Sequence, residues 1–73
     1  MILIVTLTVL RQSRGKLRYC PFSGKTNVSE ETLTYAARLP DAIDEFTQQM
    51  IDAYVDMGKG EKLISVSHLL IRP

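Results

Sequence analysis

The chain has few of the residues that cross-link small proteins. Its 73 residues include one cysteine, Cys20, and one histidine, His68, so no disulfide can form within the chain and no Cys/His cluster can hold a metal. A chain of this length forms at most one domain and buries only about 60% of its unfolded surface. Since small domains usually supplement a marginal core with a disulfide, a metal or a second chain, we expect a homodimer.

Long hydrophobic segments are also lacking. The longest apolar stretch, 2–10, is interrupted by Thr6 and Thr8 and is much shorter than the roughly 20 residues that a bilayer requires. It has neither the basic region before it nor the small-residue cleavage site after it that a signal peptide needs. We therefore expect no membrane partner and a cytoplasmic location, where a lone thiol stays reduced.

The net charge is close to zero, but the charges are unevenly distributed. Residues 1–29 carry five basic side chains and no acid, whereas residues 30–56 carry seven acids against Arg38 alone. A hydrophobic content of 45% with 23% charged residues is ordinary for a folded globular protein. The chain therefore has a basic and an acidic segment that can contact different partners.

Alternating apolar residues predict most of the strands. Residues 2–10 alternate at a period of two and are rich in β-branched side chains, which is typical of a strand. A three-residue loop at 13–15 leads to a returning strand at 16–20 that Pro21 should stop, so that 22–27 forms a loop. A final strand is predicted at 62–71, with Ile64, Val66, His68 and Leu70 on one face and Leu63, Ser65, Ser67, Leu69 and Ile71 on the other.

An amphipathic helix is predicted from Pro40 or Asp41 to Met57. Its apolar residues recur every three or four positions and form one stripe, made of Ile43, Phe46, Met50, Tyr54 and Met57. Gly58 and Gly60 should end it. The preceding segment, 29–39, has two interpretations: its period-two pattern favours a strand, whereas Ser29 as a cap followed by Glu30 and Glu31 favours a helix.

These elements predict an α+β fold. We expect a small antiparallel or mixed β-sheet, in the order β-β-(β)-α-β, with one amphipathic helix packed on one face. The other face of the sheet would present Thr, Ser, Ile and Leu side chains to water. Such a surface usually marks an interface.

Motifs for catalysis or cofactor binding are not found. Gly24-Lys25-Thr26 has the form of the end of a phosphate-binding loop, but Tyr19 stands where that loop needs a glycine. Cys20 and His68 are predicted to pack as ordinary strand residues, because nothing in the sequence places an activating group beside either. We therefore predict no catalytic, cofactor-binding or metal-binding residue.

Two charged clusters are candidates for partner binding. Arg11, Arg14, Lys16 and Arg18 fall within eight residues on the predicted hairpin, where a basic two-stranded ribbon could contact nucleic acid. Asp52 and Asp56 lie near the C-terminal end of the predicted helix, where a negative charge is unfavourable. These two acids are predicted to form an acidic face that contacts a basic protein partner.

The sequence thus favours a non-enzymatic protein–protein interaction module. It would act as a homodimer, with the uncovered sheet face or an edge strand as the shared interface, and would also bind a protein partner not identifiable from the sequence. Nucleic-acid binding through the basic hairpin is the alternative, and an enzyme with a site shared between two chains is a third, weaker interpretation.

Overall fold

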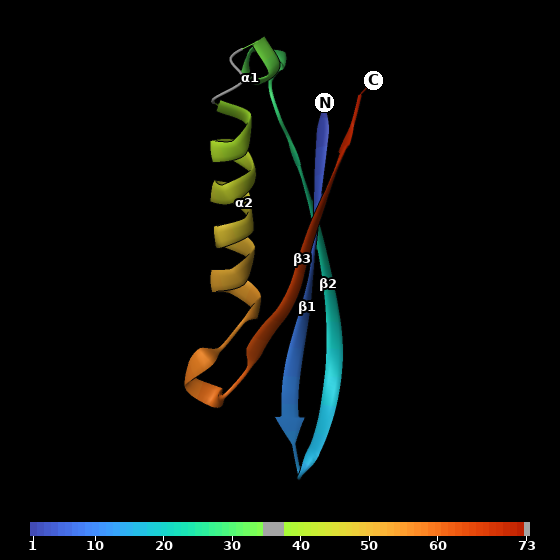
Figure 1. The fold of residues 1–73 in the computed structure, drawn as a ribbon, viewed down its shortest axis with the longest axis vertical. Helices are drawn as coiled ribbons and strands as arrows, with labels where there is room; N and C mark the ends of the chain where they lie inside the picture. The colour runs from blue at the N-terminus through green and yellow to red at the C-terminus, as the bar shows by residue number, and fades with distance from the viewer. Residues whose placement is uncertain (35–37, 73) are drawn as a thin grey trace.

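Three antiparallel strands form a sheet whose central strand is the N-terminal one. A computed structural model describes residues 1–34 and 38–72. In it β1 (Ile2–Ser13) pairs with β2 (Lys16–Asn27) on one side and with β3 (Lys62–Ile71) on the other. The helices α1 (Glu30–Thr34) and α2 (Arg38–Tyr54) and the 3-10 turn η1 (Met57–Lys59) lie between β2 and β3 in the chain. α2 runs along one face of the sheet (Figure 1), which confirms the predicted α+β class.

The core is built from alternate residues of β1. Leu3, Val5, Leu7 and Val9 are fully buried on the side that faces α2, where Met50 is also buried. Ile43 and Phe46 of α2 pack against this cluster, as the predicted stripe requires. The opposite face of the sheet, here called the open face, carries the other residues of β1 and has no helix over it (Figure 1).

The hairpin between β1 and β2 closes with a two-residue turn rather than the predicted three-residue loop. Ser13 pairs directly with Lys16, and Arg14 and Gly15 both have a positive φ, 53° and 75°. Two successive positive φ values are typical of the type I′ turn, whose twist matches that of the strands it joins. Ser13 is therefore the last residue of β1 and not part of the loop.

β2 continues past Pro21, so the predicted stop at Pro21 and the predicted loop at 22–27 are both wrong. Pro21 pairs with Thr8, and the strand runs on to Asn27 opposite Ile2. A proline is tolerated here because β2 is an edge strand, where one side of the backbone needs no partner strand. The composition of 22–27 resembled a loop, but the register with β1 extends through it.

The segment 29–39 is helical where the structure describes it, so the favoured strand interpretation is wrong for Glu30–Thr34 and for Arg38 and Leu39. Residues 35–37 lie outside the described part of the chain. Ser29 precedes α1: its carbonyl accepts a hydrogen bond from the Thr32 N–H at 3.1 Å, and its hydroxyl hydrogen-bonds to the hydroxyl of Thr32 at 2.9 Å. Two glutamates occupy the first turn, where the helix dipole favours negative charge.

α2 spans Arg38–Tyr54, two residues earlier at its start and three earlier at its end than predicted. Pro40 lies in the first turn, where its missing N–H leaves no helical bond unmade. Asp56 is extended beyond the helix, and Gly60 adopts a left-handed φ of 77° after η1. Met57, predicted as the end of the apolar stripe, therefore lies outside α2 and is exposed.

β3 has the predicted bounds, but its faces differ from the prediction because of a bulge. Thr8 pairs with Ser65 and Val9 with Leu63, so Ile64 is an extra residue on β3. The extra residue reverses the alternation and turns Leu63 toward the core. Strict alternation had placed Leu63 on the same face as Ser65.

Candidate functional site

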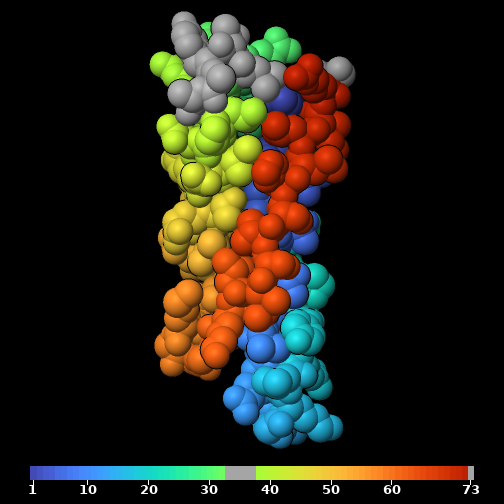
Figure 2. Space-filling view, viewed as in Figure 1, coloured from blue at the N-terminus to red at the C-terminus, as the bar shows by residue number. Residues whose placement is uncertain are grey.

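The tip of the β-hairpin is an exposed basic arm. Every residue of the segment 12–19, here called the hairpin arm, is exposed, and the arm extends beyond the C-terminal end of α2 (Figures 1 and 2). Arg14 lies in the turn, and Lys16 and Arg18 follow on β2. Within the described residues no ion pair involves these three side chains. Their charges are therefore available to an anionic partner.

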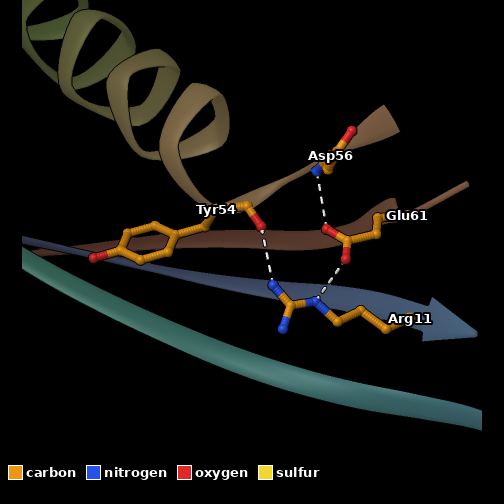
Figure 3. A network of polar contacts seen from close by, with 4 residues as sticks. All are labelled: Arg11, Tyr54, Asp56 and Glu61. Atoms are coloured by element: carbon orange, nitrogen blue, oxygen red, sulfur yellow. Dashed lines mark hydrogen bonds and ion pairs between the residues drawn. The ribbon is translucent and has the colours of Figure 1, made fainter. Parts of the chain in front are cut away.

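Arg11 is separated from this basic group by its contacts. Its Nε lies 2.8 Å from Oε2 of Glu61, in an ion pair without the alignment of a hydrogen bond, and its Nη2 donates to the carbonyl of Tyr54 at 3.4 Å (Figure 3). Its guanidinium also lies 5.0 Å from the centroid of Phe22. The sequence grouped Arg11 with Arg14, Lys16 and Arg18, but in the fold it connects the hairpin to the end of α2.

The same cluster fixes the turn after the helix. The other carboxylate oxygen of Glu61, Oε1, accepts a hydrogen bond from the backbone N–H of Asp56 at 2.9 Å (Figure 3). The rings of Phe22 and Tyr54 stack with centroids 4.7 Å apart. One polar and aromatic cluster thus joins four parts of the fold: β1, β2, the end of α2 and the start of β3.

The two acids predicted as a partner-binding face do not share a helix. Asp52 lies on α2 and accepts a hydrogen bond from Nε2 of Gln48, one turn earlier, at 2.8 Å. Asp56 lies past the helix, immediately before η1. Both are exposed.

Cys20 and His68 are held apart by the central strand. Cys20 pairs with Val9 from β2, whereas His68 pairs with Val5 from β3. Cys20 is half-buried and His68 is exposed. A site that uses both side chains within one chain is therefore not formed by this fold.

Gly24 has a packing role that the sequence did not reveal. It lies on β2, opposite Val5, and a Cβ at this position would come within 2.9 Å of Sδ of Met50 and 3.4 Å of Phe46. The absence of a side chain lets α2 approach β2 closely. The tripeptide Gly24-Lys25-Thr26 therefore belongs to a strand and not to a phosphate-binding loop.

The β3 edge carries the largest set of exposed apolar side chains on one element. Ile64, Val66, Leu69 and Ile71 are 50%, 44%, 58% and 43% exposed. Val66 lies on the side of α2, opposite Leu7, whereas Leu69 and Ile71 lie on the open face, opposite Ile4 and Ile2. The sequence signal for this edge was present in the apolar residues on both faces of the segment 62–71, but the sequence did not show which strands are at the edges.

Residues 1–34 and 38–72 hold no group of three or more His, Cys, Asp or Glu side chains placed to bind a metal ion. None of the helices in these ranges is long and apolar enough to cross a membrane.

Fold and surfaces together define a small α+β protein with a basic hairpin arm and an apolar sheet edge. Comparison with known proteins gives no match to a family model, a curated protein or a solved structure. The hairpin arm and the β3 edge are therefore the two candidate functional surfaces of this fold.

Proposed function

We propose that this protein is a non-enzymatic protein–protein interaction module that acts as a homodimer. The observation that carries the proposal is the row of exposed apolar side chains along β3 and the open face: Ile2, Ile64, Val66, Leu69 and Ile71. Surfaces of this kind usually mark interaction sites in folded proteins. Six described side chains form the buried apolar core, so a second chain would add substantially to the apolar area removed from water.

The homodimer is tested by sedimentation equilibrium over a range of protein concentrations. We expect a mass of twice 8.2 kDa at the upper end of the range, with dissociation on dilution. A mass of 8.2 kDa at every concentration up to about 1 mM would overturn the proposal. A Kd of 1 mM corresponds to a binding free energy of about 4 kcal/mol, and a dimer weaker than that would not be detected.

Nucleic-acid binding is a second candidate, favoured by the hairpin arm. Arg14, Lys16 and Arg18 project on a two-stranded ribbon beyond the body of the protein, together with the exposed ring of Tyr19 (Figure 2). A basic ribbon can enter a groove or follow a phosphate backbone, and an exposed aromatic ring can stack on a base. Neutralising phosphates releases counterions, so affinity should fall steeply with salt.

This second candidate is tested by NMR titration with mixed-sequence DNA and RNA at low and high salt. Amide shifts confined to the hairpin arm that disappear at high salt would support it. The variant Arg18→Gln should weaken binding, whereas Lys25→Gln, a matched change of an exposed cation at the other end of β2, should not. Equal losses in both variants would indicate nonspecific attraction, and absence of shifts at low salt would eliminate the candidate.

A further inference from the structure

We infer that the second copy of the chain docks edge to edge through β3, so that two sheets join antiparallel into one sheet of six strands. This inference rests on the proposed homodimer and specifies its interface. The strand order would be β2-β1-β3 in one protomer, continued by β3-β1-β2 of its partner, about a two-fold axis near the middle of β3.

The two edges of the sheet differ in how they resist pairing. β2 carries Lys16, Arg18 and Lys25 and also Pro21, and charged residues and proline are common means of keeping an edge strand unpaired. β3 begins with Lys62 and has a bulge at Ile64, but from Ser65 to Ile71 it has no proline, lysine, arginine or acid. The single titratable side chain in this stretch is His68.

β3 has exposed apolar side chains on both faces, as an interior strand does, although Ser65 and Ser67 on its open face are polar. An edge strand of a sheet covered on one face usually alternates between apolar and polar, whereas strands covered on both faces are apolar on both. β3 exposes Val66 on the helix side and Leu69 and Ile71 on the open side. Val66 is 44% exposed, whereas Leu7, its paired residue on β1, is fully buried. α2 therefore covers β1 but leaves the outer part of β3 uncovered.

The β3 edge is open along its length. Figure 2 looks onto it: β3, orange to red, lies in front of β1, with α2 beside it. Ten strand residues span about 33 Å, which is the length over which two copies can pair. A stable interface buries about 800 Å² per partner, so the flank of α2 beside β3 has to take part in the contact as well.

The open face is a poorer interface because hydroxyl groups cross its middle. Thr6 is flanked there by Ser23 on β2 and Ser67 on β3, and a hydrogen bond of 3.0 Å joins the hydroxyls of Thr6 and Ser23. Thr8 and Ser65 lie beside them. Face-to-face packing would remove these groups from water, whereas edge pairing leaves them hydrated and gives the free backbone groups of β3 new partners.

A second copy fits this edge better than a charged segment would. In an antiparallel pair about a two-fold axis each residue of β3 meets another residue of the same strand. Because Leu63–Ile71 is free of permanent charge, such self-pairing brings no like charges together along this stretch. Val66, which lies on the side of α2, would be covered by the second copy.

The test compares the native chain with three variants by sedimentation equilibrium. Val66→Lys places a charge on the β3 edge away from the open face, Ile2→Lys places one on the open face of the central strand, and Leu17→Lys is a matched apolar-to-lysine control on the hairpin arm. We expect Val66→Lys to weaken dimerisation at least tenfold, and Ile2→Lys and Leu17→Lys to remain within about threefold of the native chain.

The outcomes separate the interface from the homodimer itself. If Val66→Lys dimerises as tightly as the native chain while Ile2→Lys dissociates, the edge inference is wrong and the homodimer stands, with its interface on the open face. If the native chain is a monomer, the homodimer and its β3 interface are both wrong, and any partner that pairs with the β3 edge is a different protein.

Cysteine cross-linking keeps the test decisive if Val66→Lys does not fold. In a Cys20→Ser background, Ser67→Cys and Ser23→Cys place a single thiol on opposite edges, at residues that both pair with Thr6. Cα atoms must approach within about 7 Å for a disulfide. Rapid oxidation to a covalent dimer is expected for Ser67→Cys only, and preferential cross-linking of Ser23→Cys would overturn the inference.

Discussion

At the scale of single residues, Gly24 decides how closely α2 packs on the sheet. Its missing side chain leaves room for the buried side chain of Met50 and for Phe46. Glycine in a strand is otherwise unfavourable, because it loses more backbone entropy on folding than other residues. Its presence opposite Val5, at the level of the core, is therefore explained by helix–sheet contact.

We expect Gly24→Ala to destabilise the protein by about 1 kcal/mol in urea unfolding, since the added methyl group overpacks the core and the flexible end of Met50 absorbs part of the strain. Met50→Ala supplies the control, because it removes Sδ and Cε of Met50, the two atoms nearest to the new methyl group. In that background Gly24→Ala should be neutral or stabilising. An equal cost in both backgrounds would show that the contact with Met50 is not the cause.

At the scale of the elements, the cluster around Arg11 joins the hairpin to the connection between α2 and β3. Arg11 lies directly opposite Arg18 on β2, an arrangement of like charges that is unfavourable by itself. Glu61 provides the compensating charge, and its side chain is only 13% exposed. The ion pair therefore lies in a less hydrated setting than an ordinary surface pair.

A double-mutant cycle with Arg11→Met and Glu61→Gln measures this pair. Glutamine keeps an oxygen that can accept the Asp56 N–H, so the variant removes mainly the charge. We expect a coupling of about 0.5–1 kcal/mol that decreases in high salt, because the Arg11 side chain is 39% exposed. Glu45→Gln, an exposed acid on α2, should change stability by less than about 0.5 kcal/mol. A coupling near zero would make the cluster a packing feature alone.

The sequence predicted those elements whose pattern is strong and local. The alternation of 2–10, the part of the α2 stripe formed by Ile43, Phe46 and Met50, and the bounds of β3 follow from periodicity, and the structure has all three. The prediction failed where pairing with β1 determines the outcome. β2 continues through Pro21 and Gly24 because β1 supplies a partner there, and composition alone cannot show that partner.

The candidate sites show the same division. The exposure of Arg14, Lys16 and Arg18 could be predicted because they lie in and beside a charged turn. The ion pair of Arg11 could not, because its partner, Glu61, lies fifty positions later in the chain. The bulge at Ile64, which turns Leu63 inward, left no trace in the alternating pattern. The apolar edge of β3 could be recognised only once the strand order was known.

At the scale of the whole molecule, the two edges of the sheet differ. β2 carries charges and a proline and leads to the basic hairpin arm, whereas β3 has neither a charged residue nor a proline from Ser65 to Ile71. Antiparallel pairing through β3 would place the two hairpin arms at opposite ends of the six-stranded sheet. Binding to an anionic partner and dimerisation would then use separate surfaces, so a variant of one should leave the other intact.

The most direct measurement is amide hydrogen exchange along β3 in the native chain, with β2 as the internal reference. In an isolated edge strand, alternate amides bond to the neighbouring strand and the others point to water, which gives alternating slow and fast exchange. We predict continuous protection through the middle of β3 and alternation in β2. Alternating exchange in β3 at concentrations where the chain is dimeric would contradict edge-to-edge pairing.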